Sequence, residues 1–181
     1  MLRTERLVVR RWRLDDLDAW EAFNADPLVY GALGGAPLPR DACDAMAAWH
    51  NDLHAHEGIG LLALERTADG AFLGMCGLHH QETFPDDVEI AWRLASEHWG
   101  HGYATEAATS WLDHAFGPLA LDRVLSLTDR DNARSLAVMR RLGMSHVGDA
   151  VVRDGDEVFD ALVHEVTAAS WRVVRQGGRR G

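Results

Sequence analysis

The sequence predicts an α/β fold in which helices lie on both sides of a mixed sheet. Strand-like runs alternate with helical patterns along the whole chain. The 181 residues are enough to bury a core within one domain, and 47% apolar with 25% charged residues is typical of globular proteins. We find no internal repeat and no linker. Residues 1–181 are therefore expected to form a single domain with a frayed tail over 173–181.

Strands are expected where apolar and β-branched residues gather between turn signals. They cover residues 4–12, 59–66, 71–80, 88–94, 121–128, 145–153 and 157–166. The turns of two hairpins fall at 67–70 and 153–156. Residues 31–39 and 81–87 are expected to be loops, because turn-forming residues interrupt the apolar pattern there.

The first two helices are expected in the N-terminal third, where apolar residues recur three and four positions apart. One helix has Trp20 on its apolar face and can be capped by Asp15 or Asp16. The other covers residues 41–57 and has Trp49 on its apolar face. Both tryptophans are expected in the core.

Two further helices follow in the C-terminal half. The apolar face of the first consists of Ala104, Ala107, Ala108, Trp111, Leu112 and Ala115. A Gly-Pro pair at 117–118 ends this helix. The second covers residues 131–143, with Asp131 or Asn132 as its cap and Gly143 at its end.

The charge and cysteine content narrow the classes of function. Asp and Glu number 28 against 18 Lys and Arg, and the net charge of −10 argues against binding to nucleic acid or to an anionic membrane. Two cysteines, Cys43 and Cys76, imply no disulfide framework. The N-terminal stretch lacks the apolar run of a signal peptide, and no run approaches 18 apolar residues. We therefore expect a cytoplasmic protein.

The stretch HWGHGYATEAA, residues 98–108, is the strongest candidate for a binding site. It follows a predicted strand and opens a predicted helix, where unpaired backbone N–H groups and the helix dipole favour an anion. Without side chains at Gly100 and Gly102, a phosphate or pyrophosphate can approach those donors. The alternative is a turn that needs glycine geometry and binds nothing.

Two common nucleotide motifs do not fit this stretch. The dinucleotide fingerprint G-x-G-x-x-G requires a third glycine, where this chain has Thr105. The acidic residue that should follow the next strand is also misplaced, because Asp122 precedes it. No run matches the G-x-x-x-x-G-K-[ST] loop of nucleoside triphosphatases.

Over nearly its whole length the chain resembles the GNAT superfamily of acyl-CoA N-acyltransferases, in the branch typified by RimJ and RimL. The segments that carry this resemblance are TERLVVRRW, DGAFLGMCGL, VEIAWRLASEHWGHGYATEAA and DNARSLAVMRRLGMSHVG. Trp99 stands where the superfamily usually has Gln or Arg, a substitution common in this branch. The resemblance implies the GNAT fold, an α+β arrangement whose mostly antiparallel sheet splays at its centre.

The resemblance also implies acetyl-CoA as acyl donor. The residues it places at the cofactor are Trp92, Arg93, Leu94, Trp99, Gly100, His101, Gly102, Tyr103, Ala104, Thr105, Asn132, Arg134, Ser135, Arg140 and Arg141. The loop from Gly100 to Thr105 would cradle the pyrophosphate, and the strand over 91–94 would pair with the pantetheine arm. Asn132 can instead be a helix cap only, and the three arginines a solvated helix face.

The implied catalytic residues are Glu89 and Ser135. Glu89 would act as general base through water, with His79, His80 and Glu82 as rivals; an ordinary ion pair is the alternative for Glu89. Ser135 would assist the thiolate, in place of the tyrosine found elsewhere in the superfamily. Because a serine hydroxyl is a much weaker acid than a thiol, we expect a hydrogen bond to sulfur or a water relay. Helix capping is its alternative.

The expected function is transfer of an acetyl group to a primary amine by direct attack in a ternary complex. The acceptor suggested by the branch is a protein or peptide N-terminal amine. Alternatives are a small-molecule amine, such as an amino acid, polyamine or aminoglycoside, and a non-catalytic acyl-CoA-binding module. No metal is expected, because His50 and His54 lack a third ligand. The resemblance also suggests a homodimer, since dimerisation is common in this branch.

Overall fold

The computed structural model describes residues 1–30, 37–154 and 157–177, and its fold class is the expected one. The chain divides into two compact units, and each is described by itself. The first unit comprises Met1–Leu78 and Ala91–Ser110, and the second comprises His79–Ile90 and Trp111–Gly181. Strands β4 and β5 and helix α4 each contribute residues to both units. The eight-stranded sheet is mixed and mostly antiparallel.

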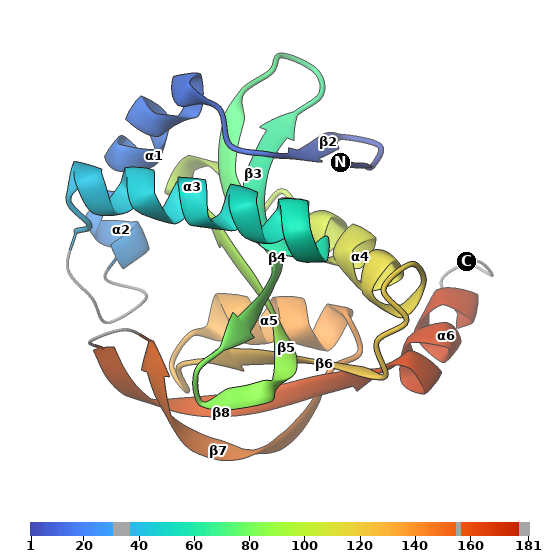
Figure 1. Ribbon diagram of the computed structural model, residues 1–181. Helices are drawn as coiled ribbons and strands as arrows, with labels where there is room; N and C mark the ends of the chain where they lie inside the picture. The colour runs from blue at the N-terminus through green and yellow to red at the C-terminus, as the bar shows by residue number, and fades with distance from the viewer. Residues whose placement is uncertain (31–36, 155–156, 178–181) are drawn as a thin grey trace. The chain divides into compact units, whose positions relative to one another are not determined.

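In the described part of the first unit, η1, α1, α2 and α3 precede strands β3 and β4 (Figure 1). Its elements are β1 Leu2–Arg3, β2 Leu7–Arg10, η1 Leu14–Asp16, α1 Leu17–Asn24, α2 Pro27–Tyr30, α3 Arg40–Glu57, β3 Gly60–Arg66, most of β4 Phe72–Gln81, the end of β5 Phe84–Leu94, η3 Ser96–His98 and the start of α4 Tyr103–Phe116. The strand order is β1-β2-β3-β4-β5, and the pairs β1-β2, β2-β3 and β3-β4 are antiparallel.

The core of the first unit lies between α1, α3 and the strands. Trp12 and Trp20 lie 4.9 Å apart between ring centroids, and Trp20 stacks on Phe23 at 5.0 Å. Cys43 and Ala47 of α3 are buried against this aromatic cluster, one helical turn apart. Apolar burial of this kind supplies most of the driving force for folding.

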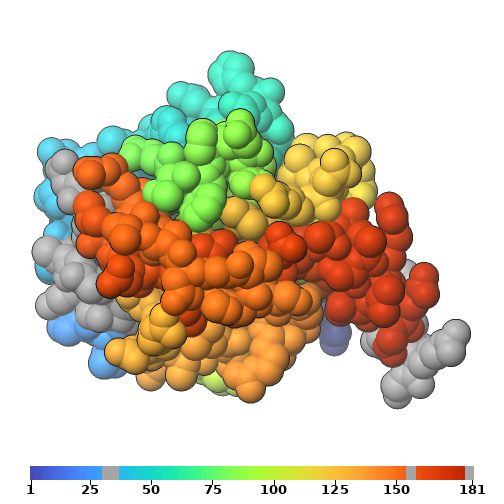
Figure 2. Space-filling model, turned by 90° about the horizontal axis from the view of Figure 1, so that it is seen from below, coloured from blue at the N-terminus to red at the C-terminus, as the bar shows by residue number. Residues whose placement is uncertain are grey.

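The second unit contains the beginning of β5, the end of α4 and the C-terminal elements. These are β6 Arg123–Thr128, α5 Ala133–Arg141, β7 Ser145–Asp154, β8 Glu157–Thr167 and α6 Ala168–Gly177. The strand order is β5-β6-β8-β7. Strands β7 and β8, coloured orange to red, form much of this unit's surface on the face seen in Figure 2.

Strands β5 and β6 are the one parallel pair registered in the described part of the chain, at Glu89 and Leu125. All other registered pairs there are antiparallel; β6 pairs with β8 from Arg123 to Thr128. The short parallel contact agrees with a sheet that opens at this point. The predicted divergence of residues 91–94 from the next strand stays a prediction.

Several local predictions are confirmed. Trp20 and Trp111 are fully buried, and the apolar face of α4 includes Ala107, Ala108 and Leu112 without exposure. The side chain of Asn132 caps α5. Gly58 and Gly143 end α3 and α5 in the left-handed conformation, with φ of 75° and 71°. Residues 31–36 of the expected loop over 31–39 lie outside the described residues.

The expected loop over 81–87 is wrong in its second half, because β5 begins at Phe84. Only residues 82–83 form a turn, which Gln81 and Thr83 hold by hydrogen bonds to each other and to the backbone of Arg153. Aspartate is common in loops, so Asp87 favoured the loop prediction. In the structure it forms a two-bond ion pair with Arg123 of β6, at 2.6 and 2.8 Å, which holds it in the strand.

The frayed tail is wrong for residues 173–177, which belong to α6; residues 178–181 lie outside the described part. The Trp171 side chain is buried, and its indole N–H donates to Asp113 over 2.9 Å. Arg175 forms an ion pair with the same carboxylate at 3.0 Å. These contacts hold α6 against α4. The local sequence of α6 did not predict a helix there.

Two N-terminal predictions are also wrong. Trp49 is half exposed, because α3 turns Cys43, Ala47 and His50 inward instead. Asp16 makes no side-chain cap to α1; its carboxylate accepts two hydrogen bonds from the buried Arg10 guanidinium.

Candidate functional site

The glycine turn between β5 and α4 is the best-formed part of the candidate site. Gly100 and Gly102 have φ of 79° and 80°, which side-chain-bearing residues rarely adopt. A Cβ at Gly100 would meet nothing within 4 Å, and one at Gly102 would meet only the Arg6 guanidinium at 3.6 Å. Glycine is therefore needed at both positions for the conformation and the exposure of the backbone, because no neighbouring atom would crowd a side chain there.

The turn is tied to the elements on both sides. The Trp99 indole N–H donates to the Leu94 carbonyl over 2.8 Å, which fixes the start of the turn to the end of β5. The Glu106 N–H donates to the Gly102 carbonyl over 3.0 Å, so helical bonding begins there. Amides ahead of Glu106 lie at the helix N-terminus, where backbone donors lack helical acceptors and attract an anion.

Two residues far away in sequence hold the start of α4, and sequence reasoning missed both. Arg6 binds the Glu106 carboxylate through its side chain, at 2.6 and 2.7 Å, and through its backbone N–H at 2.9 Å. The Thr4 hydroxyl donates to the same carboxylate. Burial pushes the pKa of Glu106 upward, but these hydrogen bonds bring it below its ordinary value. Both residues lie in the TERLVVRRW segment, which carries the family resemblance but did not predict this contact.

The end of β5 is partly covered. Trp92 and Arg93 are half-buried and Leu94 is buried. The Arg93 guanidinium donates to the Asn24 amide oxygen of α1 over 3.4 Å. Gly74 of β4, with φ of 132°, approaches so closely that a Cβ there would lie 2.2 Å from the Arg93 carbonyl oxygen. The backbone of this segment is therefore fixed by its neighbours.

In the second unit, Glu89 is buried and meets His79. The backbone N–H of Leu127 donates to one carboxylate oxygen of Glu89 over 3.1 Å. The other oxygen lies 3.4 Å from His79 Nε2. The structure thus brings together two of the four predicted bases, whereas His80 and Glu82 are exposed. A buried carboxylate next to an imidazole is suited to accept and pass on a proton.

The predicted second cofactor segment also lies in the second unit. The Asn132 side-chain oxygen accepts a hydrogen bond from the Ser135 N–H over 3.1 Å, so Asn132 caps α5. Ser135 is half-buried. The three candidate phosphate ligands on this helix, Arg134, Arg140 and Arg141, are all exposed.

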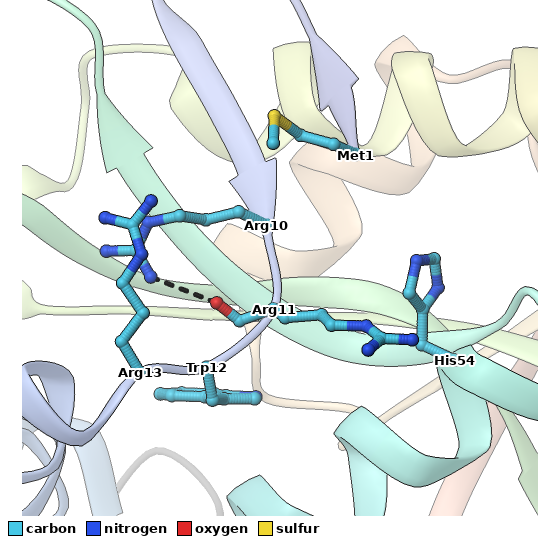
Figure 3. Close-up of a pocket in the computed structure, with 6 residues that line it drawn as sticks. All are labelled: Met1, Arg10, Arg11, Trp12, Arg13 and His54. Atoms are coloured by element: carbon cyan, nitrogen blue, oxygen red, sulfur yellow. Dashed lines mark hydrogen bonds between the residues drawn. The ribbon is translucent and has the colours of Figure 1, made fainter.

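A pocket of about 290 Å³ lies elsewhere in the first unit, at the end of β2 (Figure 3). Its lining consists of Met1, Arg10, Arg11, Trp12, Arg13 and His54, none of them a predicted site residue. Arg10 is already paired with Asp16 and Glu65, both at 2.6 Å. A hydrogen bond of 3.1 Å also joins it to the Arg11 carbonyl. The buried cation of this pocket, Arg10, is therefore neutralised by two carboxylates.

Three other kinds of site find little support in the described residues. They contain no group of three His, Cys, Asp or Glu side chains placed to hold a metal. Burial raises the pKa of Cys43 and Cys76, which disfavours a thiolate nucleophile. Within the same residues, every helix is too short or too polar to cross a bilayer.

Comparison with known proteins gives a consistent result. A family model described as an acetyltransferase (GNAT) domain matches residues 6–145. An acetyltransferase structure from Agrobacterium tumefaciens is 31% identical, with a TM-score of 0.78 and coverage of 91% of this chain and 92% of that one. Mycobacterium smegmatis RimJ in complex with CoA-disulfide is 21% identical, with a TM-score of 0.72 and coverage of 94% and 89%, and is similar in fold.

Two curated Bacillus proteins are also similar. The uncharacterized N-acetyltransferase p20 of Bacillus licheniformis is 27% identical over 164 residues, which cover 90% of each chain. The uncharacterized protein YkkB of Bacillus subtilis is 34% identical over 99 residues. That match covers 54% of this chain and 58% of YkkB.

Proposed function

Because the chain belongs to the GNAT acetyltransferase family, we propose that it transfers an acetyl group from acetyl-CoA to a primary amine, by direct attack in a ternary complex. The observation that carries this proposal is the turn at Gly100 and Gly102. Its two left-handed glycines leave backbone donors open at the start of a helix. That arrangement fits the diphosphate of coenzyme A, which presents paired anions. Acetyl-CoA supplies the activated acetyl thioester.

We assign the backbone from Gly100 to Thr105 to the diphosphate, and Trp99 to the start of that cradle. Residues Trp92, Arg93 and Leu94 would offer main-chain groups to the pantetheine arm. Asn132 would hydrogen-bond that arm in addition to capping α5. Arg134, Arg140 and Arg141 would attract the remaining phosphate, which their exposure favours.

We assign general-base catalysis to Glu89, acting through a water on the acceptor amine. Its burial and the hydrogen bond from Leu127 hold the carboxylate in one orientation. His79, 3.4 Å away, can pass the proton on toward solvent. General-base assistance of this kind is worth roughly 100-fold to 10,000-fold in rate.

The remaining tasks fall to the backbone and to Ser135. A main-chain N–H of residues 91–94 would donate to the carbonyl oxygen as negative charge builds on it. Ser135 would donate a hydrogen bond to the departing sulfur. Its backbone N–H is held by Asn132, so its hydroxyl is not needed for capping.

We propose a protein or peptide N-terminal amine as acceptor, in the cytoplasm. An α-amine has a pKa of about 7.7–8.0, so roughly a tenth is neutral at pH 7. A lysine amine, near pKa ~10.4, lies about 2.5 units higher, which adds about 3.4 kcal/mol to deprotonation. The α-amine is therefore the acceptor that requires less assistance from Glu89 and His79.

The test is release of free thiol from acetyl-CoA with a panel of amines. The panel contains short peptides with free N-termini, the same peptides with blocked N-termini, amino acids, polyamines and aminoglycosides. Release with free peptides alone supports the proposal. Release with a small amine alone favours small-molecule acetylation. Tight acetyl-CoA binding without release with any amine favours a non-catalytic binding module.

A further inference from the structure

The contacts of Arg6 join the N-terminal segment to the glycine turn. Its guanidinium binds the Glu106 carboxylate through two nitrogens, at 2.6 and 2.7 Å. A third nitrogen, Nη1, donates to the His101 carbonyl over 3.0 Å. The same group lies 4.7 Å from the centre of the Tyr103 ring. One side chain thus contacts the middle of the turn and the first turn of α4.

The contact with His101 determines where the next amide points. The peptide bond between His101 and Gly102 is trans, so its carbonyl and its N–H point in opposite directions. Because Arg6 holds the carbonyl, the Gly102 N–H is directed away from Arg6. Gly102 has no side chain to restrict rotation of this peptide, so an external contact is needed to fix it.

The contact with Glu106 removes an electrostatic conflict. A carboxylate in the first turn of a helix is stabilised by the dipole, yet it would repel an anion bound at the same end. Arg6 neutralises the charge of the Glu106 carboxylate. On the side that faces the N-terminal segment, Arg6 and Thr4 also donate hydrogen bonds to its oxygens. The helix end therefore keeps its positive potential for a second anion.

We propose that Arg6 is a positioning residue for the acetyl-CoA diphosphate: it orients the Gly102 amide through His101 and cancels the charge of Glu106. This inference rests on the proposed function. It adds a role for a residue that lies about 100 positions before the turn in sequence. Arg6 acts through the loop backbone and does not take part in the chemical step.

The test compares two acyl donors that differ in the diphosphate. For Arg6→Gln we expect kcat/KM with acetyl-CoA to fall about tenfold or more, mainly through KM, as expected for loss of charge-assisted hydrogen bonds. With S-acetylpantetheine, which has no diphosphate, kcat/KM should change less than about twofold. Arg13→Gln is the control: Arg13 is an exposed arginine with one ion pair, to Glu65 at 3.2 Å. It should change neither value.

An equal fall with both donors would overturn the proposal, because it would indicate general damage. An unchanged kcat/KM of Arg6→Gln with acetyl-CoA would also overturn the proposal.

If Arg6→Gln does not fold, Arg6→Lys replaces it. A single ammonium keeps the charge but lacks the planar fork, so a smaller loss confined to acetyl-CoA is expected. The double variant R6Q/E106Q should bind coenzyme A at least about threefold more tightly than R6Q. No recovery would refute the electrostatic part.

Failure of the proposed function would look different. A wild-type protein that uses both donors equally well, or that does not bind coenzyme A in calorimetry, contradicts the role of the glycine turn itself. If the wild-type protein prefers acetyl-CoA and R6Q retains that preference in full, only the role of Arg6 is contradicted.

Discussion

At the scale of single residues, the candidate site combines backbone positions set by nearby residues with side-chain contacts set by distant ones. The glycines at 100 and 102 and the cap at Asn132 are local features, so spacing alone predicted them. The contact of Arg6 with Glu106 was not predicted, because the two residues are 100 positions apart in sequence. The pairing of His79 with Glu89 likewise depends on how β4 and β5 lie against each other, which no local pattern specifies.

Replacing Gly102 by valine should weaken coenzyme A binding at least about tenfold. A β-branched residue with φ near 80° is strained by about 1–2 kcal/mol, and its side chain would cover the open backbone. Gly70→Val is the matched control, because Gly70 also has positive φ, 73°, with open space around it, but lies in the hairpin before β4. Calorimetry should find reduced affinity in the first variant only; equal affinities would contradict the assignment.

Glu89→Gln should lower kcat about 100-fold or more and leave the KM for acetyl-CoA nearly unchanged. The amide oxygen can still accept the hydrogen bond from Leu127, so the fold should persist, as circular dichroism would verify. Glu165→Gln, a substitution on β8 that loses only a 3.9 Å ion pair to Arg123, is the control. Retention of full turnover by Glu89→Gln would remove it from the mechanism.

Ser135→Ala should reduce kcat more than it raises the apparent KM for acetyl-CoA, because the lost hydrogen bond to sulfur matters as the thiolate departs. The cap of α5 should survive, since Asn132 accepts from the Ser135 backbone and not from its hydroxyl. Steady-state kinetics at several acetyl-CoA concentrations separate the two constants. A change confined to KM would leave Ser135 with a binding role only.

At the scale of elements, local periodicity predicted α4 and α5 with their ends, because their apolar faces and caps are continuous in sequence. It failed for α6 and for the start of β5. In both cases the stabilising partners are distant: Asp113 holds Trp171 of α6, and Arg123 holds Asp87 of β5. Tertiary contacts overrode weak local signals at these two places.

Strand β8 should make stability depend on pH through His164. Burial, and then the nearby His146, lower the pKa of His164 in the folded state. The unfolded chain, with a histidine pKa near ~6.5, therefore takes up the proton first. Stability should be full above that value and should decrease as the pH falls through the lower folded-state pKa.

Urea unfolding at pH 8 and pH 5 measures this effect. His164→Gln should lose less stability than the wild type over that interval, whereas His56→Gln, at an exposed site on α3, should behave like the wild type. Equal pH dependence in His164→Gln and in the wild type would exclude this histidine as a source.

At the scale of the whole molecule, the fold class followed from the order of helices and strands, and the activity class followed from a match over residues 6–145. The identity of the acceptor did not follow from either. An acceptor is recognised by side chains near the reacting group, and the order of helices and strands does not specify these side chains. The role proposed for the glycine turn concerns the acyl donor and gives no information on the acceptor.

We propose that the backbone between Gly100 and Thr105 binds the diphosphate of coenzyme A. The most direct measurement is an NMR titration of 15N-labelled protein with coenzyme A, following the amide signals of residues 100–105. We predict large, saturable shifts at these amides, and smaller ones with pantetheine, which has no diphosphate. Coenzyme A binding that leaves these amides unshifted, or shifts that pantetheine reproduces in full, would contradict the claim.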